Sequence, residues 1–462
     1  MKAHDGMYID GAWRRAAGPD VIEVVNPADE QVIATVPAGT AEDVDAAVRA
    51  ARAAFPAWAA TPPAERAARL AALRDVLQAR KDEIAETVTA ELGSPLAFSQ
   101  AVHAAVPIAV AASYADLAAT YSFEEKAGTS TVHHEPVGVV GAITPWNYPL
   151  HQIVAKVAPA LAAGCTIVLK PAEDTPLTAR LFAEAVHEAG VPAGVFNLVT
   201  GLGPVAGQAL AEHPGTDMVS FTGSTAVGKR IGAIAGGAVK RVALELGGKS
   251  ANVILPSADL AKAVNVGVAN VMSNSGQTCS AWTRMLVHRD QYDRAVELAA
   301  AAAAKYGDRI GPVVNAKQQA RVRGYIEKGL AEGARLVAGG PDAPRERGYF
   351  VSPTVFADVT PEMTIAQEEI FGPVLSVLRY EDEEDALRIA NGTVYGLAGA
   401  VWAGDEAEAV AFARRMDTGQ VDINGGRFNP LAPFGGYKQS GVGRELGTHG
   451  LAEYLQTKSL QF

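Results

Sequence analysis

The chain has 462 residues, 48% hydrophobic and 20% charged, which indicates two or three globular domains. Its 40 basic and 51 acidic residues give a formal net charge of -11 without a basic block, which argues against nucleic acid or an anionic membrane as a partner. The first residues lack the apolar stretch of a signal peptide, and uncharged runs such as 157–169 are short. We therefore expect a soluble, cytoplasmic protein. The two cysteines, Cys165 and Cys279, are far apart and lack nearby histidines, so neither a disulfide nor a metal site is expected.

The N-terminal part predicts a long helix. Residues 61–93, TPPAERAARLAALRDVLQARKDEIAETVTAELG, open with prolines, repeat apolar residues at helical spacing and end at Gly93. Residues 121–138 then alternate threonine, valine and charged residues like an exposed strand pair, and residues 453–462 predict another strand. Such strands would offer edges for pairing between subunits; a surface hairpin and a frayed tail are the alternative.

From about residue 136 onward, β-branched runs alternate with alanine-rich helical segments. The predicted strands are VGVVGAI, TIVLK, FNLVT, MVSFTG and VALEL, with helices over 151–162, 177–189, 204–213 and 225–235. This alternation predicts a parallel, doubly wound sheet. Residues 248–440 repeat it with RMLVHR, VLSVLRY and LAGAVWA, which predicts a second α/β domain.

The stretch VSFTGSTAVGKR at 219–230 resembles a phosphate-binding P-loop that lacks its final Ser or Thr, because that position is Arg230. Arginine does not ligate magnesium, which argues against a nucleotide triphosphatase. A strand followed by Gly223, Ser224 and a helix still leaves free backbone N–H groups for a pyrophosphate. Glycines at such turns also have purely steric causes, and GLGPVAG at 201–207 carries only part of a dinucleotide fingerprint.

Several residues have side chains suited to catalysis. Cys279, in NSGQTCSAWTR, lies among small polar residues, which suits an accessible loop where a thiolate is stabilised; a buried structural cysteine is the alternative. Glu245 lies in an apolar run where its pKa would rise, as a general base requires, or it is a strand-edge glutamate. Asn147, between two prolines, would donate to an oxyanion or cap the turn. Lys170 and Glu173 follow a predicted parallel strand, where doubly wound sheets bind ligands.

Seven motifs, in this order, closely resemble the aldehyde dehydrogenase superfamily: ITPWNYP, VLKPAE, FTGSTAVG, LELGGKS, GQTCSAWTR, EEIFGPV and APFGGYKQSGVGRE. The resemblance implies an α/β fold with a doubly wound cofactor-binding domain, an α/β catalytic domain and a small β oligomerisation element. The implied boundaries are 1–117 and 137–247 for the cofactor-binding domain, 248–440 for the catalytic domain, and 118–136 with 441–462 for the oligomerisation strands and C-terminal segment.

The resemblance also implies residue roles in catalysis. Cys279 would attack the aldehyde as a thiolate, and Asn147 with the backbone N–H of Cys279 would hold the oxyanion. Hydride transfer would leave a thioester, which water activated by Glu245 hydrolyses. Lys156 and Glu445 match the family's proton-relay positions. Members that transfer the acyl group to coenzyme A commonly lack this glutamate, so Glu245 favours hydrolysis.

The implied cofactor is NAD rather than NADP, because the carboxylate of Glu173 accepts hydrogen bonds from ribose hydroxyls and repels a 2′-phosphate. In the resemblance, Lys170 and Glu173 hold the adenine-side ribose, and Glu369 holds the nicotinamide ribose. The complete set of implied cofactor-binding residues is Thr144, Trp146, Lys170, Glu173, Gly203, Gly207, Phe221, Gly223, Ser224, Val227, Leu246, Gly247, Glu369 and Phe371.

The implied partner is a small-molecule aldehyde. The substrate funnel would be formed by Tyr148, His151, Trp282, Phe428 and Phe434, which suit an apolar or aromatic aldehyde. Arg427 would meet a substrate carboxylate in a semialdehyde, or it is a solvated loop arginine. A non-catalytic homologue of the fold is a further alternative. The edge strands imply a homodimer or homotetramer.

Overall fold

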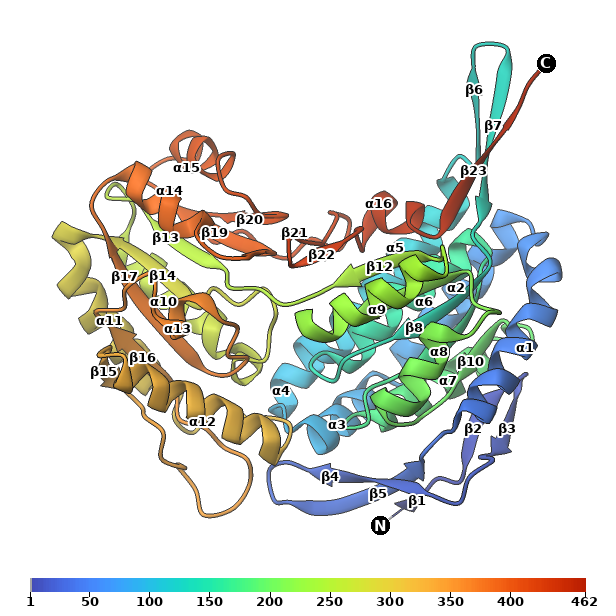
Figure 1. The fold of residues 1–462 in the computed structure, drawn as a ribbon, viewed down its shortest axis with the longest axis horizontal. Helices are drawn as coiled ribbons and strands as arrows, with labels where there is room; N and C mark the ends of the chain where they lie inside the picture. Colours follow the sequence, from blue (N-terminus) through green and yellow to red (C-terminus); the bar gives the residue numbers. More distant parts are fainter. Residues whose placement is uncertain (1) are drawn as a thin grey trace.

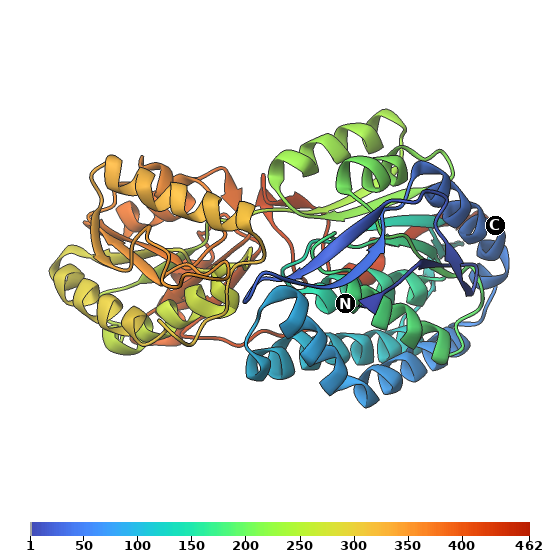
Figure 2. The same cartoon turned by 90° about the horizontal axis from the view of Figure 1, so that it is seen from below.

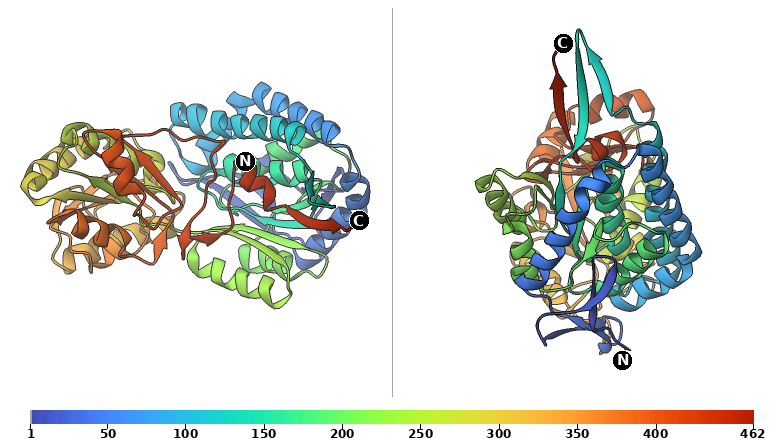
Figure 3. Two further views of the ribbon diagram at one scale, coloured as in Figure 1. Left: turned by 90° about the horizontal axis from the view of Figure 1, so that it is seen from above. Right: turned by 90° about the vertical axis from the view of Figure 1, so that its right-hand side faces the viewer.

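The computed structural model describes residues 2–462 and has two lobes (Figures 1 and 2). A slender sheet projects from the first lobe (Figure 1). The first lobe contains most of the chain up to residue 245, and the second contains residues 251–423. The chain crosses between them over 246–250 and returns before residue 441; Figure 3 shows the returning segment in red. Both α/β sheets predicted from the alternating pattern are confirmed.

The first lobe contains an eight-stranded sheet in the order β22-β12-β11-β8-β9-β10-β2-β3. Its five central strands, β12 to β10, are parallel. They are rich in valine, isoleucine and leucine because helices cover both faces of the sheet. The strands are β2 (Gly6–Ile9), β3 (Ala12–Arg15), β8 (Val139–Ile143), β9 (Thr166–Lys170), β10 (Phe196–Leu198), β11 (Met218–Thr222), β12 (Arg241–Glu245) and β22 (Gly441–Val442). A small sheet beside them contains β1 (Lys2–Ala3), β4 (Val21–Asn26) and β5 (Gln31–Pro37).

The strand order reverses between β8 and β11. From β8 the chain adds β9 and β10 on one side, and then returns to add β11 and β12 on the other. Ligands of doubly wound sheets bind outside the carboxyl ends of the strands at such a reversal. The loops that follow β8 and β11, which carry Asn147 and Ser224, both start at this point.

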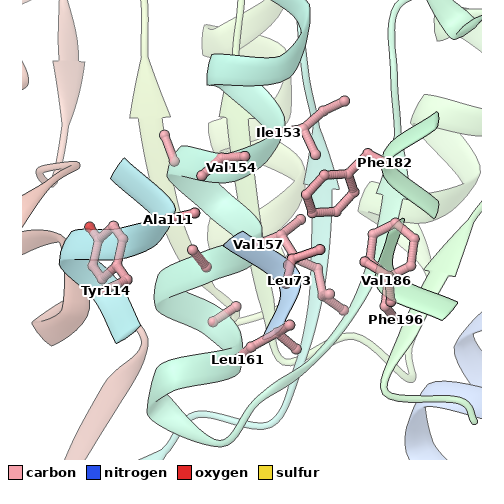
Figure 4. Close-up of a cluster of buried hydrophobic side chains, with 14 of the residues drawn as sticks. Leu73, Ala111, Tyr114, Ile153, Val154, Val157, Leu161, Phe182, Val186 and Phe196 are labelled. Carbon is pink, nitrogen blue, oxygen red and sulfur yellow. The ribbon is translucent and has the colours of Figure 1, made fainter. Parts of the chain in front are cut away.

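The helices of the first lobe surround its core. Figure 4 shows α6 residues such as Val157 and Leu161 packed near Leu73, Phe182 and Phe196. The helices are α1 (Ala41–Ala59), α2 (Pro63–Ala79), α3 (Lys81–Leu92), α4 (Leu96–Phe98), η1 (Ser99–Ala104), α5 (Ala105–Thr120), α6 (Pro149–Ala163), α7 (Pro176–Glu188), η2 (Gly203–Gly207), α8 (Gln208–Glu212), α9 (Thr225–Gly237) and α16 (Gly447–Ala452).

Two sequence predictions in this lobe were wrong. The single long helix over 61–93 is two helices, α2 and α3, separated at Arg80; its predicted end at Gly93 is confirmed by a left-handed C-cap. The uncharged run was also underestimated: residues 96–120 form a continuous helical stretch long and apolar enough to cross a membrane by length and composition. This stretch packs against α2 and α6, as a core helix of the lobe does.

The second lobe contains a seven-stranded sheet in the order β15-β16-β17-β14-β13-β19-β20, which is parallel apart from β15. Its strands are β13 (Ala251–Ile254), β14 (Arg284–His288), β15 (Arg335–Ala338), β16 (Thr354–Ala357), β17 (Val374–Tyr380), β19 (Ala398–Trp402) and β20 (Gln420–Ile423), and β18 (Tyr395–Gly396) pairs separately with β21 (Tyr437–Lys438). Its helices are α10 (Leu260–Met272), η3 (Ser273–Gly276), η4 (Arg289–Gln291), α11 (Tyr292–Ala304), α12 (Ala316–Ala331), α13 (Thr364–Gln367), α14 (Glu383–Asn391) and α15 (Glu406–Ala413).

The projecting sheet joins the two segments predicted as exposed strands. β6 (Glu124–Ala127) and β7 (Ser130–Pro136) form a hairpin, and the C-terminal strand β23 (Leu455–Leu460) pairs antiparallel with β7. The order β23-β7-β6 leaves β23 and β6 as the two edges (Figure 3).

Candidate active site

A cavity of about 290 Å³ lies between the lobes, at the reversal point of the first sheet. Residues from both lobes line it: Pro145, Trp146, Asn147, Gln152, Thr222, Gly223, Ser224, Leu246, Gly247, Cys279, Lys317, Gln318, Arg321, Glu369 and Phe371. We call it the cofactor cavity, because many of the residues that the sequence predicted for the cofactor are among these.

The glycines between β11 and α9 have steric causes. A Cβ on Gly223 would lie 2.5 Å from the ring of Phe221, and one on Gly228 would lie 2.3 Å from Leu246 Cδ2, so Gly228 lets α9 pack closely on the end of β12. Lys229 and Arg230 are exposed on the helix surface. The P-loop spacing therefore results from packing, and Ser224 at the start of α9 is the residue that lines the cavity.

Seven of the predicted cofactor residues lie outside this cavity. The Thr144 amide donates to the Lys170 carbonyl over 3.1 Å, and Lys170 Nζ lies 3.0 Å from Glu173 Oε2. Gly207 lies beside them, since a Cβ there would be 3.9 Å from Lys170 Cδ. The remaining three are Gly203, which has open space around it, Val227, which is 46% exposed on α9, and Phe221, which is buried in β11 with its ring beside Gly223.

On the second lobe, Glu369 and Phe371 reach the cofactor cavity. Glu369 Oε1 accepts a hydrogen bond from the Gly248 amide over 3.1 Å, and burial raises the pKa of this carboxyl to about 7. Gly247 makes room for it, because a Cβ there would lie 2.5 Å from Glu369 Oε2. Phe371 packs edge-to-face on Trp146, with ring centroids 5.3 Å apart.

The cysteine loop has a strained backbone. The three residues Asn274, Ser275 and Gly276 have φ values of 50°, 56° and 75°. A Cβ on Gly276 would lie 2.0 Å from the Gly372 carbonyl, so the glycine is required by space as well as by its backbone angle. Two consecutive non-glycine residues with positive φ store strain of about 1–3 kcal/mol each, and such strain is typical of functional loops.

Cys279 is half-buried and lines the cofactor cavity. Burial raises the pKa of its thiol, and the nearby carboxylates Glu369 and Glu245 raise it further. Both effects favour the thiol over the thiolate, which is opposite in direction to the stabilised thiolate expected from the sequence. Cys165 is buried and donates to the Tyr454 carbonyl over 3.4 Å, which fits the structural role expected from its apolar surroundings.

Asn147 is placed beside this loop by the turn between β8 and α6. Its Nδ2 donates to the Gln277 carbonyl over 3.0 Å, two residues before Cys279, and its own carbonyl accepts from Asn274 Nδ2 over 2.7 Å. The side chain is 2% exposed. These bonds hold the amide at the wall of the cavity that Cys279 also lines.

Glu245, Lys156 and Glu445 form a buried charged cluster. Lys156 Nζ lies 2.6 Å from Glu445 Oε1 and donates to Ser220 Oγ over 3.1 Å. Glu245 ends β12, is 4% exposed, and its Oε2 has no hydrogen-bond partner. Burial raises the pKa of Glu245 well above its usual range, and the charge of Glu445 raises it further.

A second cavity of about 300 Å³ opens on the other side of Cys279. We call it the substrate cavity; it is lined by Val102, Val106, Tyr148, His151, Gln152, Thr278, Cys279, Ser280, Gln420, Phe428, Phe434 and Glu445. His151 lies edge-to-face with Phe428, with centroids 5.9 Å apart, and burial lowers the pKa of its imidazole. Tyr148 Oη bonds Thr278 Oγ1 over 2.7 Å.

Trp282 does not line the substrate cavity. It is 3% exposed and packs in the hydrophobic core of the second lobe with Met272, Met285 and Trp402. Trp282 lies three residues after Cys279 and two residues before the start of β14 at Arg284, and its side chain packs against the sheet. Trp282 therefore belongs to the core of the second lobe, and its prediction as a substrate residue was wrong.

Sequence reasoning missed other residues that line the cavities. Lys317, Gln318 and Arg321 come from α12, and only the packing of the second lobe brings this helix to the cofactor cavity. Val102 and Val106 come from the apolar stretch 96–120. Within residues 2–462 no group of three or more His, Cys, Asp or Glu side chains is arranged to hold a metal ion.

Two cavities that meet at one cysteine, with a helix N-terminus on one side and aromatic side chains on the other, define an oxidoreductase with a dinucleotide and a small organic substrate. Comparisons with known proteins identify its family: the sequence profile described as "Aldehyde dehydrogenase family" matches residues 13–460. The chain belongs to the aldehyde dehydrogenase family, and its activity is the oxidation of an aldehyde with a nicotinamide cofactor.

Individual relatives resemble the whole chain. A 3-succinoylsemialdehyde-pyridine dehydrogenase from a Pseudomonas species is 47% identical over 100% of this chain and 99% of its own length. The crystal structure of an aldehyde dehydrogenase C mutant from Pseudomonas syringae, complexed with NAD+ and octanal, is 47% identical, has a TM-score of 0.98, and the match covers 99% of this chain and 96% of that one. An aldehyde dehydrogenase from Mycobacterium tuberculosis complexed with NAD+ is 46% identical, with a TM-score of 0.97 and coverage of 100% and 98%.

Proposed function

We propose that the protein oxidises an apolar straight-chain or aryl aldehyde to its carboxylic acid, with NAD preferred over NADP, through a thioester on Cys279. The observation that carries this proposal is the meeting of the two cavities at Cys279, where one cavity is lined mainly by apolar and aromatic side chains. An aldehyde carbon placed there has the nucleophile on one side and room for a nicotinamide on the other.

In the first step, the Cys279 thiol loses its proton to water, and the thiolate Sγ then forms a bond to the aldehyde carbon as the carbonyl π electrons move to the oxygen. The developing oxyanion accepts hydrogen bonds from Asn147 Nδ2 and the Cys279 backbone N–H, donors that the protein fixes in advance. NAD, when bound, would supply the hydride acceptor for the conversion of this adduct to the thioester. Residues of the cofactor cavity and the Lys170–Glu173 pair would hold the cofactor.

In the second step, water attacks the thioester carbon, its proton passes to Glu245, and the bond to Sγ breaks to release the acid. The unpartnered Oε2 of Glu245 suits a base that acts on a transient water. The Lys156–Glu445 pair, which interacts electrostatically with Glu245, would carry the proton away.

Glu173 supports the preference for NAD. Its side chain is 38% exposed at the end of β9, beside the buried Lys170. The carboxylate can accept hydrogen bonds from ribose hydroxyls, and it would repel a 2′-phosphate. NAD+ is the cofactor in the complexes of the two structural relatives described above.

The composition of the substrate cavity supports an apolar substrate. Val102, Val106, Phe428 and Phe434 line it, and Arg427 is exposed on its loop and does not line it. A substrate carboxylate would therefore lack a cationic partner from Arg427. Among the relatives described above, one is named as a 3-succinoylsemialdehyde-pyridine dehydrogenase and the structure of another is complexed with octanal, an apolar chain aldehyde.

We expect kcat/KM to be highest for medium-chain and aromatic aldehydes, lower for short ones, and lowest for those with a terminal carboxylate. One methylene group in an apolar pocket is worth roughly 1–3 kcal/mol, or about 10- to 200-fold. Reduction of nicotinamide, followed at its absorbance with NAD and NADP in parallel, measures both preferences. A carboxylate-bearing semialdehyde as the best substrate, or a preference for NADP, would contradict this specificity.

We also propose that the protein is a homodimer or homotetramer that pairs through the projecting sheet. Its edge strands β6 and β23 carry backbone groups without a neighbouring strand on one side, a geometry that favours pairing with another chain. Light scattering on the full chain should give two or four times the monomer mass, and a proline at Ser459 in β23 should reduce it. A monomeric mass for the unaltered chain would refute this proposal.

A further inference from the structure

Gln152 is a buried residue whose side-chain Oε1 has no hydrogen-bond partner within residues 2–462. It lies on α6 and is 6% exposed, and its Oε1 is buried and accepts no hydrogen bond. Buried side-chain amides nearly always have partners, and an unmatched one costs about 1–3 kcal/mol. Such a group points to a ligand or a water that completes its bonding.

The position of Gln152 identifies where that partner would lie. Besides Cys279, it is the one residue that lines both the cofactor cavity and the substrate cavity. Its amide therefore borders the space in which the thioester forms, without belonging to the aromatic part of the substrate cavity.

Gln152 also lies close to the charged cluster. Lys156 follows it by four residues on α6, so the two side chains share one face of the helix. Lys156 bonds Glu445, and Glu445 lines the substrate cavity together with Gln152. The amide thus borders the same cavity as Cys279 and as Glu445, one carboxylate of the charged cluster.

We propose that Gln152 orients the water that hydrolyses the thioester. This inference rests on the roles proposed for Cys279 and Glu245. One O–H of the water donates to Gln152 Oε1 while the other proton passes to Glu245. The water oxygen then bonds to the thioester carbon, the bond between that carbon and Cys279 Sγ breaks, and the sulfur leaves as a thiolate. Gln152 takes no proton; it fixes the direction of attack.

The test uses Gln152→Met, which keeps the length of the side chain and removes the hydrogen bonds. 4-Nitrophenyl acetate acylates Cys279 without any cofactor, so its nitrophenolate burst reports acylation and its later steady state reports hydrolysis. We expect the burst to be retained and the steady state to fall about 10- to 100-fold, the size expected for loss of one or two hydrogen bonds. Intact-protein mass spectrometry should then find an acetyl group on the variant.

With aldehyde and NAD, the same variant should form one equivalent of reduced nicotinamide quickly and then turn over slowly. The burst counts folded, competent sites, so misfolding would be recognised; Gln152→Leu serves as a second variant. If the unaltered enzyme fails to reduce NAD with any aldehyde, the proposed function itself fails, whereas a normal burst with unchanged hydrolysis in both variants refutes only the role of Gln152.

Gln420→Met is the matched control. Gln420 lines the same substrate cavity, but its Nε2 donates to Asp422 Oδ1 over 3.1 Å and it does not reach the cofactor cavity. We expect Gln420→Met to alter the KM for the aldehyde without accumulating acyl-enzyme. Three results would overturn the proposal. They are equal accumulation of acyl-enzyme in Gln152→Met and Gln420→Met, an equal loss of burst rate and steady-state rate in Gln152→Met, and an effect of Gln152→Met on KM alone.

Discussion

Replacing Cys279 with alanine is expected to abolish aldehyde oxidation, with a loss of at least about 10⁴-fold in kcat/KM. Among the described residues that line the two cavities, Cys279 supplies the only sulfur, and without it neither the adduct nor the thioester can form. Removal of a covalent nucleophile typically lowers kcat by several powers of ten. The measurement is nicotinamide reduction with the best aldehyde at saturating NAD.

Cys165→Ala is the control for this experiment, because Cys165 is the other free thiol and is buried in the core of the first lobe. We expect it to keep its activity and to lose a modest amount of stability. NAD binding, followed by quenching of tryptophan fluorescence, should persist in Cys279→Ala. Turnover by Cys279→Ala at the rate of the unaltered enzyme would refute the assignment of the nucleophile.

The parts of the site next to the ends of parallel strands were predictable from the sequence. Asn147 and Ser224 follow β8 and β11, and the carboxyl ends of these neighbouring strands meet at one edge of the sheet. Glu245 ends β12, the next strand. A local pattern of strand, turn and helix therefore places each of these residues, and the parallel topology brings them together.

Residues that reach the site by tertiary packing were not predictable in this way. Arg321 lines the cofactor cavity because α12 packs at the edge of the second lobe, and no local motif marks it. Trp282 was misplaced because its distance from Cys279 in sequence says nothing about which way the side chain faces. Gln152 did carry a signal: it is a polar residue four positions before Lys156 on a helix whose other residues, apart from His151, are apolar.

The break between α2 and α3 likewise depends on packing. The periodicity of residues 61–93 is continuous, and no Gly or Pro stands at Arg80. In the fold, the Arg80 guanidinium bonds both Glu83 and Glu184 at 2.8 Å, and α3 then runs toward α7, whose first turn is capped by the Glu91 carboxylate. Contacts with α7, absent from any local pattern, accompany the change in direction.

Glu245→Gln is expected to slow hydrolysis of the thioester far more than it slows hydride transfer. The amide keeps the shape of the side chain and cannot accept the proton of the attacking water, so the loss should be about 10²- to 10⁴-fold. Mixing the variant with aldehyde and NAD should give a burst of reduced nicotinamide and then a slow phase. Equal loss of both phases would contradict a role confined mainly to the second step.

The pH dependence of hydrolysis provides an independent check. Burial and the charge of Glu445 raise the pKa of Glu245, and only its deprotonated form accepts a proton. The hydrolysis rate should therefore rise with pH through this raised pKa and level off above it; Glu245→Gln should lack this dependence. The rate is measured on acyl-enzyme made with 4-nitrophenyl acetate. Because the Cys279 sulfur is already acylated in this species, titration of its thiol does not affect the measured hydrolysis rate.

Glu453→Gln separates the base from its electrostatic surroundings. Glu453 lines neither cavity, accepts a hydrogen bond from the Arg444 amide over 3.1 Å, and its negative charge contributes to the raised pKa of Glu245. Removing that charge should lower the pKa of Glu245 and shift the inflection to lower pH, while the plateau rate is kept. Another group would control hydrolysis if the inflection of the pH profile moved to higher pH in Glu453→Gln. The same conclusion would follow if the inflection were unchanged in both Glu245→Gln and Glu453→Gln.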